Sequence, residues 1–292
     1  MYPKPSWPLL GKDWPNRAHS QFVRAGGLDW HVQSMGEGPT LLLIHGTGAA
    51  THSWADLMPL LAQQFHVVAM DLPGHGFTAS PRGSELSLPG MARLIGALIT
   101  SLSLAPVAII GHSAGAAIGA ELILTSTAPA RHLIALNGAF KPFDGIAAHI
   151  FPVAAKLIVL NPITIFALAS QGGDKVRVKS LLDGTGSKLS DKAIEFYARL
   201  FGVAGHVNGV LGMMARWELG KLVPRLPNLD AHMTLIVGTD DRTIPPDVSR
   251  HVAKLVKGAT LVELPRLGHL AHEEAPEAVA SEIFDVLRNN HS

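Results

Sequence analysis

The chain has 292 residues, of which 47% are hydrophobic and 16% are charged, and its formal net charge is +1 at pH 7. This length accommodates one large α/β domain with an insertion, or two small domains. The near-neutral charge, without any block rich in Lys and Arg, excludes the basic footprint of a nucleic-acid-binding protein. Cysteine is absent, which excludes disulfides and thiolate metal sites and is typical of a reducing compartment.

The sequence carries no clear targeting or membrane-spanning segment. Residues 1–8 are rich in proline and lack the apolar core of a signal peptide. The nearest candidate for a membrane span, Leu157 to Gly173, is uncharged but interrupted by Asn161-Pro162, which favours a buried or interfacial helix. We therefore expect a cytoplasmic protein without a transmembrane segment. Peripheral contact with a membrane surface remains an open alternative.

Along the first 140 residues, short apolar runs alternate with longer helical patterns, which is typical of a mostly parallel sheet with helices on both faces. Strands are expected at residues 28–35, 40–44, 66–70, 107–110 and 133–136. Helices are expected at residues 54–62, 88–102 and 114–125. This order predicts an α/β fold.

The alternation stops between about Lys141 and Leu229, where the pattern is helical, rich in Gly and Pro, and without a clear strand. Residues 174–199 are charged and amphipathic, and their alternating basic and acidic side chains are interpreted as a solvated helix face rather than a carboxylate-binding cluster. Regular alternation then returns, with strands expected at 233–237 and 260–264 and helices at 246–256 and 276–289. The sequence therefore predicts a core formed by residues 1–140 and 229–292, with residues 141–228 as an all-helical cap over one end of the sheet.

The candidate nucleophile lies in Gly111-His112-Ser113-Ala114-Gly115, directly between an expected strand and an Ala-rich helix. A sharp turn from strand to helix strains the serine backbone, projects the hydroxyl above the sheet edge and requires small residues two positions to either side. A Gly-x-Ser-x-Gly string by itself is more often an ordinary turn. Its place between a strand and a helix makes Ser113 the candidate.

A serine hydroxyl needs an imidazole to accept its proton and a carboxylate to orient that imidazole. In a doubly wound hydrolase sheet these groups follow the serine in the order acid, then histidine, each at a strand end. Asp241 is the candidate acid, because it lies in a Gly-x-x-Asp-x-x-x-Pro loop after the strand expected at 233–237. Its neighbour Asp240 is expected to be solvated or to cap a helix.

His269 is the candidate base, because Gly268-His269 follows the strand expected at 260–264. His272 lies in the same loop and is expected to pack against a helix start or to face solvent. The oxyanion of a tetrahedral intermediate needs preorganised N–H donors. We expect these from Ala114 and from Thr47, within His45-Gly46-Thr47-Gly48. Other residues are expected to be scaffold, namely the hydrogen-bonded His45, His75 and His112 and the tight turn of Asp71, Gly74 and Gly76.

With these residues in order, the chain resembles the α/β-hydrolase superfamily over essentially all of its length. This resemblance implies the α/β-hydrolase fold, with a helical cap inserted after the sixth strand, and the triad Ser113, Asp241 and His269. The segments 45–54, 71–78, 111–118 and 136–143 resemble a narrower group, the BchO magnesium-chelatase accessory proteins of bacteriochlorophyll biosynthesis. That narrower resemblance implies a role near magnesium insertion and contact with magnesium-chelatase subunits, but no particular reaction.

The substrate is less well defined by the sequence. The expected cap contributes residues 146–169 and the set Val210, Leu211, Met213, Met214 and Trp217. These side chains either line a pocket for a large apolar ligand or simply bury the cap on the core. No motif indicates a metal, nucleotide or flavin, so no cofactor is expected.

Three functions remain open at this point. The first is a serine hydrolase that cleaves an ester or similar acyl bond of a hydrophobic substrate, with tetrapyrrole-related compounds among the candidates. The second is a non-catalytic accessory that binds porphyrin or a magnesium-chelatase subunit. The third is a C–C bond hydrolase or cofactor-free peroxidase that uses the same triad.

Overall fold

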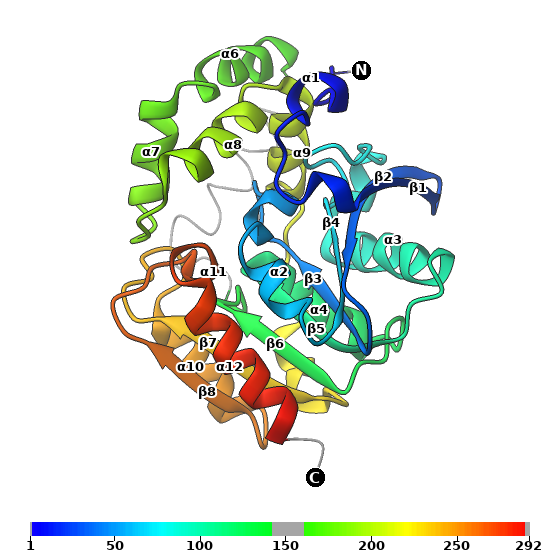
Figure 1. Ribbon diagram of the computed structural model, residues 1–292, viewed down its shortest axis with the longest axis vertical. Helices are drawn as coiled ribbons and strands as arrows, with labels where there is room; N and C mark the ends of the chain where they lie inside the picture. Colours follow the sequence, from blue (N-terminus) through cyan, green and yellow to red (C-terminus); the bar gives the residue numbers. More distant parts are fainter. Residues whose placement is uncertain (1, 142–160, 290–292) are drawn as a thin grey trace.

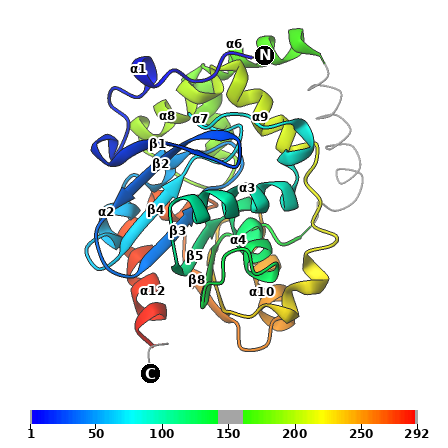
Figure 2. The ribbon, with the colours of Figure 1, turned by 90° about the vertical axis from the view of Figure 1, so that its right-hand side faces the viewer.

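The structure, a computed structural model, describes residues 2–141 and 161–289. Its centre is one eight-stranded sheet in the order β1-β2-β4-β3-β5-β6-β7-β8 (Figures 1 and 2). β2 pairs antiparallel with β1 and with β4, and every other neighbouring pair is parallel. The strands are β1 (Ser20–Ala25), β2 (Leu28–Met35), β3 (Thr40–Ile44), β4 (His66–Met70), β5 (Pro106–His112), β6 (His132–Leu136), β7 (His232–Gly238) and β8 (Thr260–Leu264).

Helices cover both faces of this sheet (Figures 1 and 2). One face carries α3 (Leu88–Ser101), α4 (Ala114–Leu124) and α10 (Pro246–Leu255), and the other carries α2 (Leu57–Leu61) and α12 (Pro276–Asn289). Side chains alternate across a strand, so Leu42 and Ile44 join the first core whereas Leu41 and Leu43 join the second. Burial on both faces explains why β3 reads as a continuous apolar run.

Between β6 and β7, the described residues contain helices and turns but no strand. These helices are α6 (Pro162–Gly172), α7 (Lys175–Asp183), α8 (Asp191–Phe201), α9 (Ala204–Met214) and the 3₁₀ helix η4 (Val223–Asn228). The helices α6 to α9 lie above the carboxyl ends of the parallel strands (Figure 1), where Ala198 of α8 shares a buried apolar cluster with Ala49 and Leu270. In contrast, η4 packs against α4. Of the expected apolar segment 146–169, residues 146–160 fall outside the described residues.

Most expected elements are present. β2, β3, β4, β8 and α12 have the expected bounds, and β5, β6 and β7 are slightly longer than expected. The sequence did not predict β1, because this edge strand pairs only with β2 and buries little besides Ala25. Remaining short elements at the amino end and elsewhere are α1 (Trp7–Leu10), η1 (Arg17–His19), η3 (Gly83–Leu86) and α11 (Ala271–Glu274).

The single helix expected at 54–62 was wrong. The segment forms the 3₁₀ helix η2 (Thr51–Trp54) and then the short helix α2, which begins at Leu57. Proline has no N–H to donate and is tolerated only in the first turn of a helix. Pro59 therefore fits a helix that begins at Leu57 and would break one that begins at Trp54.

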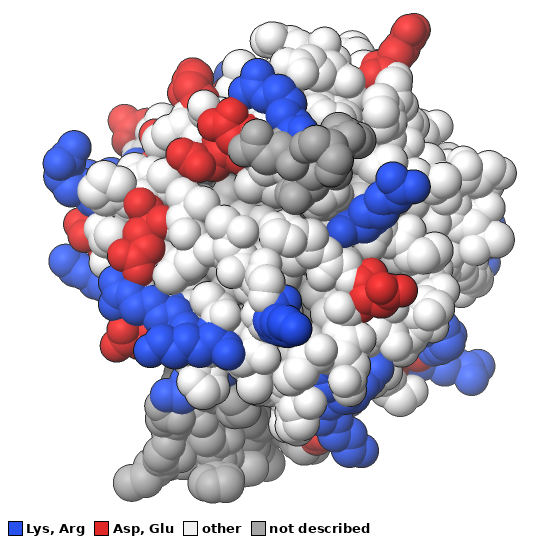
Figure 3. Space-filling model, turned by 90° about the horizontal axis from the view of Figure 1, so that it is seen from below, with Lys and Arg blue, Asp and Glu red and all other residues white. Residues whose placement is uncertain are grey.

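The surface carries few charges, as the composition requires. Positive and negative side chains are interspersed over a largely uncharged surface on the face seen in Figure 3. Within residues 2–141 and 161–289, no helix combines the length and apolarity needed to cross a bilayer.

Candidate active site

Ser113 occupies the turn between β5 and α4, and its backbone is strained. Its φ of 52° and ψ of −117° lie where residues with a side chain are rarely found. The end of β6 holds this turn, because the Ser113 N–H donates to Leu136 O at 3.0 Å and the Ala139 N–H donates to Ser113 O at 3.0 Å. The strained turn that the sequence predicts is therefore present.

The two glycines that flank Ser113 are required by close backbone packing. A Cβ atom at Gly115 would overlap the carbonyl oxygen of Ile44, and one at Gly111 would overlap the backbone of Ala116. Neither neighbour is a flexible side chain that could move aside. The pattern Gly-x-Ser-x-Gly thus has a steric cause in this fold.

Asp241 and His269 form a hydrogen-bonded pair. His269 Nδ1 donates to Asp241 Oδ2 at 2.8 Å, and both side chains are buried. The N–H groups of Thr243 and Ile244 donate to Asp241 Oδ1 at 2.8 and 2.9 Å. These donors orient the carboxylate, and the carboxylate in turn fixes the imidazole with its proton on Nδ1, which leaves Nε2 as the acceptor. Asp240, as expected, is exposed.

Ser113 and His269 are brought to the same edge of the sheet through His112. His112 Nε2 donates to the carbonyl oxygen of His269 at 2.9 Å, and the two rings lie 4.8 Å apart. Among the described residues no hydrogen bond joins Ser113 Oγ to His269. Such catalytic hydrogen bonds are often long or poorly aligned until substrate is bound.

Two free donors lie beside Ser113. Within the described part of the chain, the backbone N–H groups of Thr47 and Ala114 donate to no other residue. Gly46 brings the Thr47 loop close, because a Cβ at position 46 would lie 3.0 Å from Ser113 Cβ. Unused N–H groups of this kind can receive a developing oxyanion.

Sequence reasoning missed Asn137, which follows β6. Its Nδ2 donates to Asp241 Oδ2 at 2.7 Å, and its backbone has a φ of 48°. Asparagine is one of the few residues that tolerate this left-handed conformation. An Asn directly after a buried strand was the only signal, and it does not reveal which side chain the amide contacts.

Asn137→Ala is expected to lower the free energy of unfolding by about 2–3 kcal/mol, because it removes a hydrogen bond to a carboxylate and leaves a strained alanine. Urea denaturation would measure this loss. Asn137→Gly relieves the backbone strain and isolates the hydrogen bond, so it should be destabilised by less. Equal stability of wild type and Asn137→Ala would contradict the assignment.

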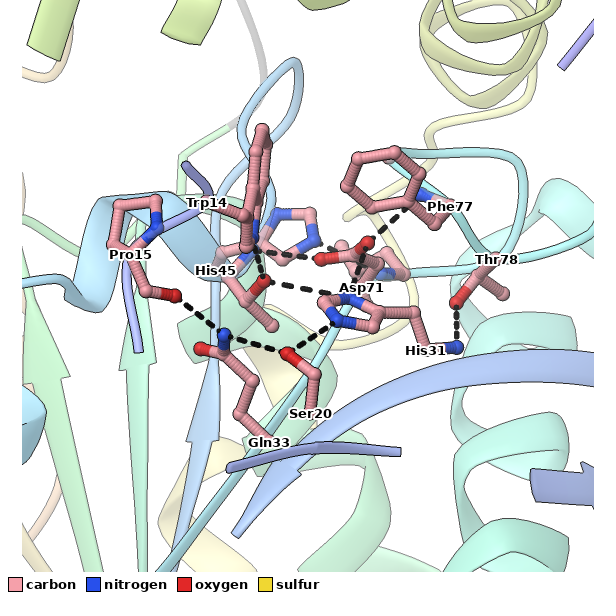
Figure 4. A network of polar contacts seen from close by, with 12 residues as sticks. Trp14, Pro15, Ser20, His31, Gln33, His45, Asp71, Phe77 and Thr78 are labelled. Carbon is pink, nitrogen blue, oxygen red and sulfur yellow. Dashed lines mark hydrogen bonds and ion pairs between the residues drawn. The ribbon is translucent and has the colours of Figure 1, made fainter. Parts of the chain in front are cut away.

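Asp71, expected in a tight turn, is the centre of a second buried network (Figure 4). Its carboxylate accepts from the N–H groups of Thr51 and Phe77 at 2.7 and 2.8 Å and from His31 Nδ1 at 2.9 Å. Burial alone would raise the pKa of Asp71, but the His31 imidazole and its hydrogen bond hold that pKa below the usual range. This carboxylate therefore ties the loops after β3 and β4 to β2.

Ser20 extends the Asp71 network into a second serine, histidine and carboxylate set. His31 Nε2 accepts from Ser20 Oγ at 3.1 Å, and the Gln33 amide donates to the same oxygen at 3.1 Å (Figure 4). Ser20 lies on the edge strand β1, without the strained turn of Ser113. We interpret this set as structural, which makes Ser20 a suitable control for Ser113.

The expected scaffold histidines are buried. His45 Nδ1 donates to Gly46 O at 2.7 Å and its Nε2 accepts from the Leu72 N–H at 2.8 Å, so it shapes the Thr47 loop. His272, for which burial and exposure were both open, is 1% exposed and bonds Ser53 Oγ at 2.9 Å. Among the described residues, no cluster of His, Asp or Glu could hold a metal ion.

Side chains of the helices after β6 also reach the site. Met213 is fully buried in the core, and its sulfur accepts from Thr47 Oγ1 at 3.7 Å. Of the two roles left open for these side chains, lining a pocket or burying the cap on the core, Met213 has the second.

The charged stretch behaves as expected, because Lys179 and Asp183 form an exposed ion pair at 2.6 Å.

Comparison with known proteins gives concordant matches. The model of the alpha/beta hydrolase family matches residues 41–282. The magnesium-chelatase 30 kDa subunit of Rhodobacter capsulatus is 37% identical over 280 residues, which cover 95% of this chain and 98% of that protein. A 2-hydroxy-6-oxo-6-(2'-aminophenyl)hexa-2,4-dienoic acid hydrolase of Metapseudomonas resinovorans is 28% identical over 91% of this chain and 90% of its own.

Solved structures agree on the fold. The enol-lactonase from Burkholderia xenovorans LB400 superimposes with a TM-score of 0.75 at 20% identity, over 92% of this chain and 100% of that chain. An alpha/beta hydrolase fold protein from Burkholderia ambifaria gives a TM-score of 0.75 at 22% identity, over 91% and 100% of the respective chains.

Proposed function

The chain belongs to the alpha/beta hydrolase family, and from this premise we propose that it is a serine hydrolase acting on an ester or similar acyl bond of a hydrophobic substrate. One observation carries the proposal. The strained Ser113 is followed, in chain order, by the hydrogen-bonded pair Asp241 and His269 at neighbouring strand ends. Family relatives named as hydrolases are consistent with it.

The proposed mechanism follows from these contacts. His269 Nε2 accepts the Ser113 proton as Oγ attacks the acyl carbon, and Asp241 stabilises the resulting imidazolium. The N–H groups of Thr47 and Ala114 receive the oxyanion, each worth about 3–4 kcal/mol of barrier in sites of this type. His269 then protonates the leaving group, and water, activated by the same imidazole, releases the acid.

We further propose that residues 141–228 act as a cap that bounds the substrate site. Support comes from the contact of Met213 with Thr47 and from the buried apolar cluster that Tyr197 and Ala198 share with Ala49. A cap over the strand ends would exclude bulk water from the acyl-enzyme.

Labelling of intact protein with a fluorophosphonate probe tests the hydrolase proposal before any substrate is known. Ser113 Oγ would displace fluoride from phosphorus, and the hydroxyl proton would pass to His269. We expect stoichiometric labelling of wild type and none of Ser113→Ala. Ser20→Ala is the matched control, because Ser20 also bonds a histidine and carboxylate pair, and it should label normally. Absence of label from wild type, or its retention in Ser113→Ala, would refute the proposal.

A pathway role is proposed from the relative of Rhodobacter capsulatus, which is named as a magnesium-chelatase subunit. We infer that this chain acts beside magnesium chelation in bacteriochlorophyll biosynthesis. The same similarity favours a second candidate, in which the protein is a non-catalytic accessory that binds chelatase subunits or porphyrin.

A phototrophic strain whose only copy carries Ser113→Ala separates these two candidates. Normal pigment at normal protein levels would favour the accessory. Pigment loss at normal protein levels would favour the enzyme.

A further inference from the structure

The connection between α7 and α8 contacts both loops that carry the acid and the base. The carbonyl oxygen of Thr185 accepts from the N–H groups of Arg242 and His269 at 3.1 and 3.4 Å. Ser187, which is 1% exposed, accepts at Oγ from the Leu270 N–H at 2.8 Å. This part of the helical insertion is therefore hydrogen-bonded to His269 and to its neighbour in the sequence.

Glu274 of α11 strengthens the same junction. Its Oε1 accepts from the Gly268 N–H at 2.8 Å, and its Oε2 accepts from the Lys188 N–H at 2.9 Å. One carboxylate thus joins the residue before His269 to the insertion. Each oxygen uses a separate backbone donor, so both are needed.

Glu273, the preceding residue, makes a second bridge. Its side chain is 6% exposed and accepts at Oε1 from the Tyr197 hydroxyl of α8 at 2.6 Å and from the Ser53 hydroxyl of η2. Burial raises the pKa of Tyr197 well above its ordinary value, so the phenol remains a donor. Apolar contacts surround this bridge, with Leu270 packed among side chains of α7 and α8.

We infer that Glu273 and Glu274 clamp the α7–α8 part of the insertion onto the loop of His269, so that the insertion positions the catalytic base. The inference rests on the proposed hydrolase function. Burying a carboxylate is costly, and apolar side chains would supply packing without that cost. Hydrogen bonds to the Gly268 N–H and the Tyr197 hydroxyl are directional, so they can fix the backbone beside His269. Apolar packing is not directional and cannot do this. Glu273 and Glu274 are therefore positioning residues.

Two variants break the clamp in different places. Glu274→Gln places an NH₂ group against one of the two N–H donors, so one bond is lost while the side-chain size is kept. Tyr197→Phe removes the hydroxyl that reaches Glu273. Glu273→Gln is a conservative variant that should keep this bridge, because the one carbonyl oxygen of glutamine can still accept from Tyr197 and Ser53. Glu277→Gln, at an exposed glutamate of α12, is the matched control.

The first measurement is hydrogen–deuterium exchange of the backbone amides of Gly268 and Leu270. We expect exchange about tenfold faster in Glu274→Gln and in Tyr197→Phe, and unchanged in Glu273→Gln and Glu277→Gln. The second is the first-order rate of Ser113 labelling at saturating fluorophosphonate, which should fall about tenfold in the same two variants, since small misplacement of a catalytic group is costly. The labelled fraction at the end point should stay complete.

A merely structural role would give a different result. Partial unfolding would lower the labelled fraction and leave the rate constant of the folded molecules unchanged. That outcome, or wild-type exchange at Gly268 and Leu270 in Glu274→Gln, would overturn the clamp. Should wild type fail to label, the hydrolase proposal fails, and the exchange measurement alone decides whether the insertion fixes the base loop.

Discussion

Replacing Asp241 by asparagine is expected to lower the turnover number for an aryl ester by about 10⁴-fold in a protein that still folds. The reason lies in the donors around the carboxylate. Thr243 and Ile244 donate to Oδ1, so an asparagine would place its carbonyl oxygen there and its NH₂ group at the position of Oδ2. That NH₂ would face His269 Nδ1, which in the wild type donates its proton to Asp241 Oδ2. The imidazole would have to accept at Nδ1 and carry its proton on Nε2, where it could no longer accept from Ser113.

Steady-state kinetics on a soluble aryl ester would measure this effect, with the loss in the turnover number rather than in KM. Asp240→Asn is the matched control, because Asp240 is the exposed neighbour in the same loop, and its turnover should be that of wild type. A loss of less than about tenfold in Asp241→Asn, or an equal loss in Asp240→Asn, would contradict the assignment of the acid.

The strand ends could be predicted because their signals are local. A continuous apolar run such as Leu41 to Ile44 indicates a strand buried on both faces. The glycines around Ser113 indicate the turn, since a side chain at Gly115 would overlap the carbonyl oxygen of Ile44. Parallel strands bring their carboxyl ends to one edge, so chain order was enough to propose which acid and histidine meet.

The supports of the candidate site could not be predicted, because they depend on contacts between distant segments. Asn137 lies 104 positions from Asp241, and nothing in its local sequence names that partner. Glu274 looks like an ordinary helical glutamate, yet it binds the Lys188 N–H, which lies 86 positions away. Hydrophobic periodicity and secondary-structure propensity describe single helices and strands. These hydrogen bonds, in contrast, form only when distant segments pack together.

Mild acid is expected to destabilise this protein strongly, by at least about 3 kcal/mol between pH 7 and pH 5.5. Burial lowers the pKa of several histidines below their ordinary value of 6.5, to about 3 for His52 and about 4 for His206. The full set is His45, His52, His75, His112, His206 and His272. Below pH 6.5 the unfolded chain protonates these rings, whereas burial opposes their protonation in the folded protein. The unfolded state then binds more protons, so the free energy of unfolding falls with pH, by up to about 1.4 kcal/mol per pH unit for each ring.

Chemical denaturation at pH 8, 7, 6 and 5.5 would measure this loss in the free energy of unfolding. Glu273 acts in the opposite direction and reduces the loss. Burial raises the pKa of Glu273 to about 7, so between pH 7 and 4.5 the folded state holds a proton that the unfolded state lacks. Protonation of Glu273 therefore raises the free energy of unfolding as the pH falls and offsets the effect of one histidine. Glu273→Gln should then make the loss of stability with falling pH steeper. His206→Gln should reduce the loss of stability between pH 7 and pH 5.5 by about 1 kcal/mol. His251→Gln, at an exposed position, should leave that loss unchanged. A stability that is the same at pH 7 and 5.5 would mean that the buried rings are protonated in the folded protein, or that they are open to water.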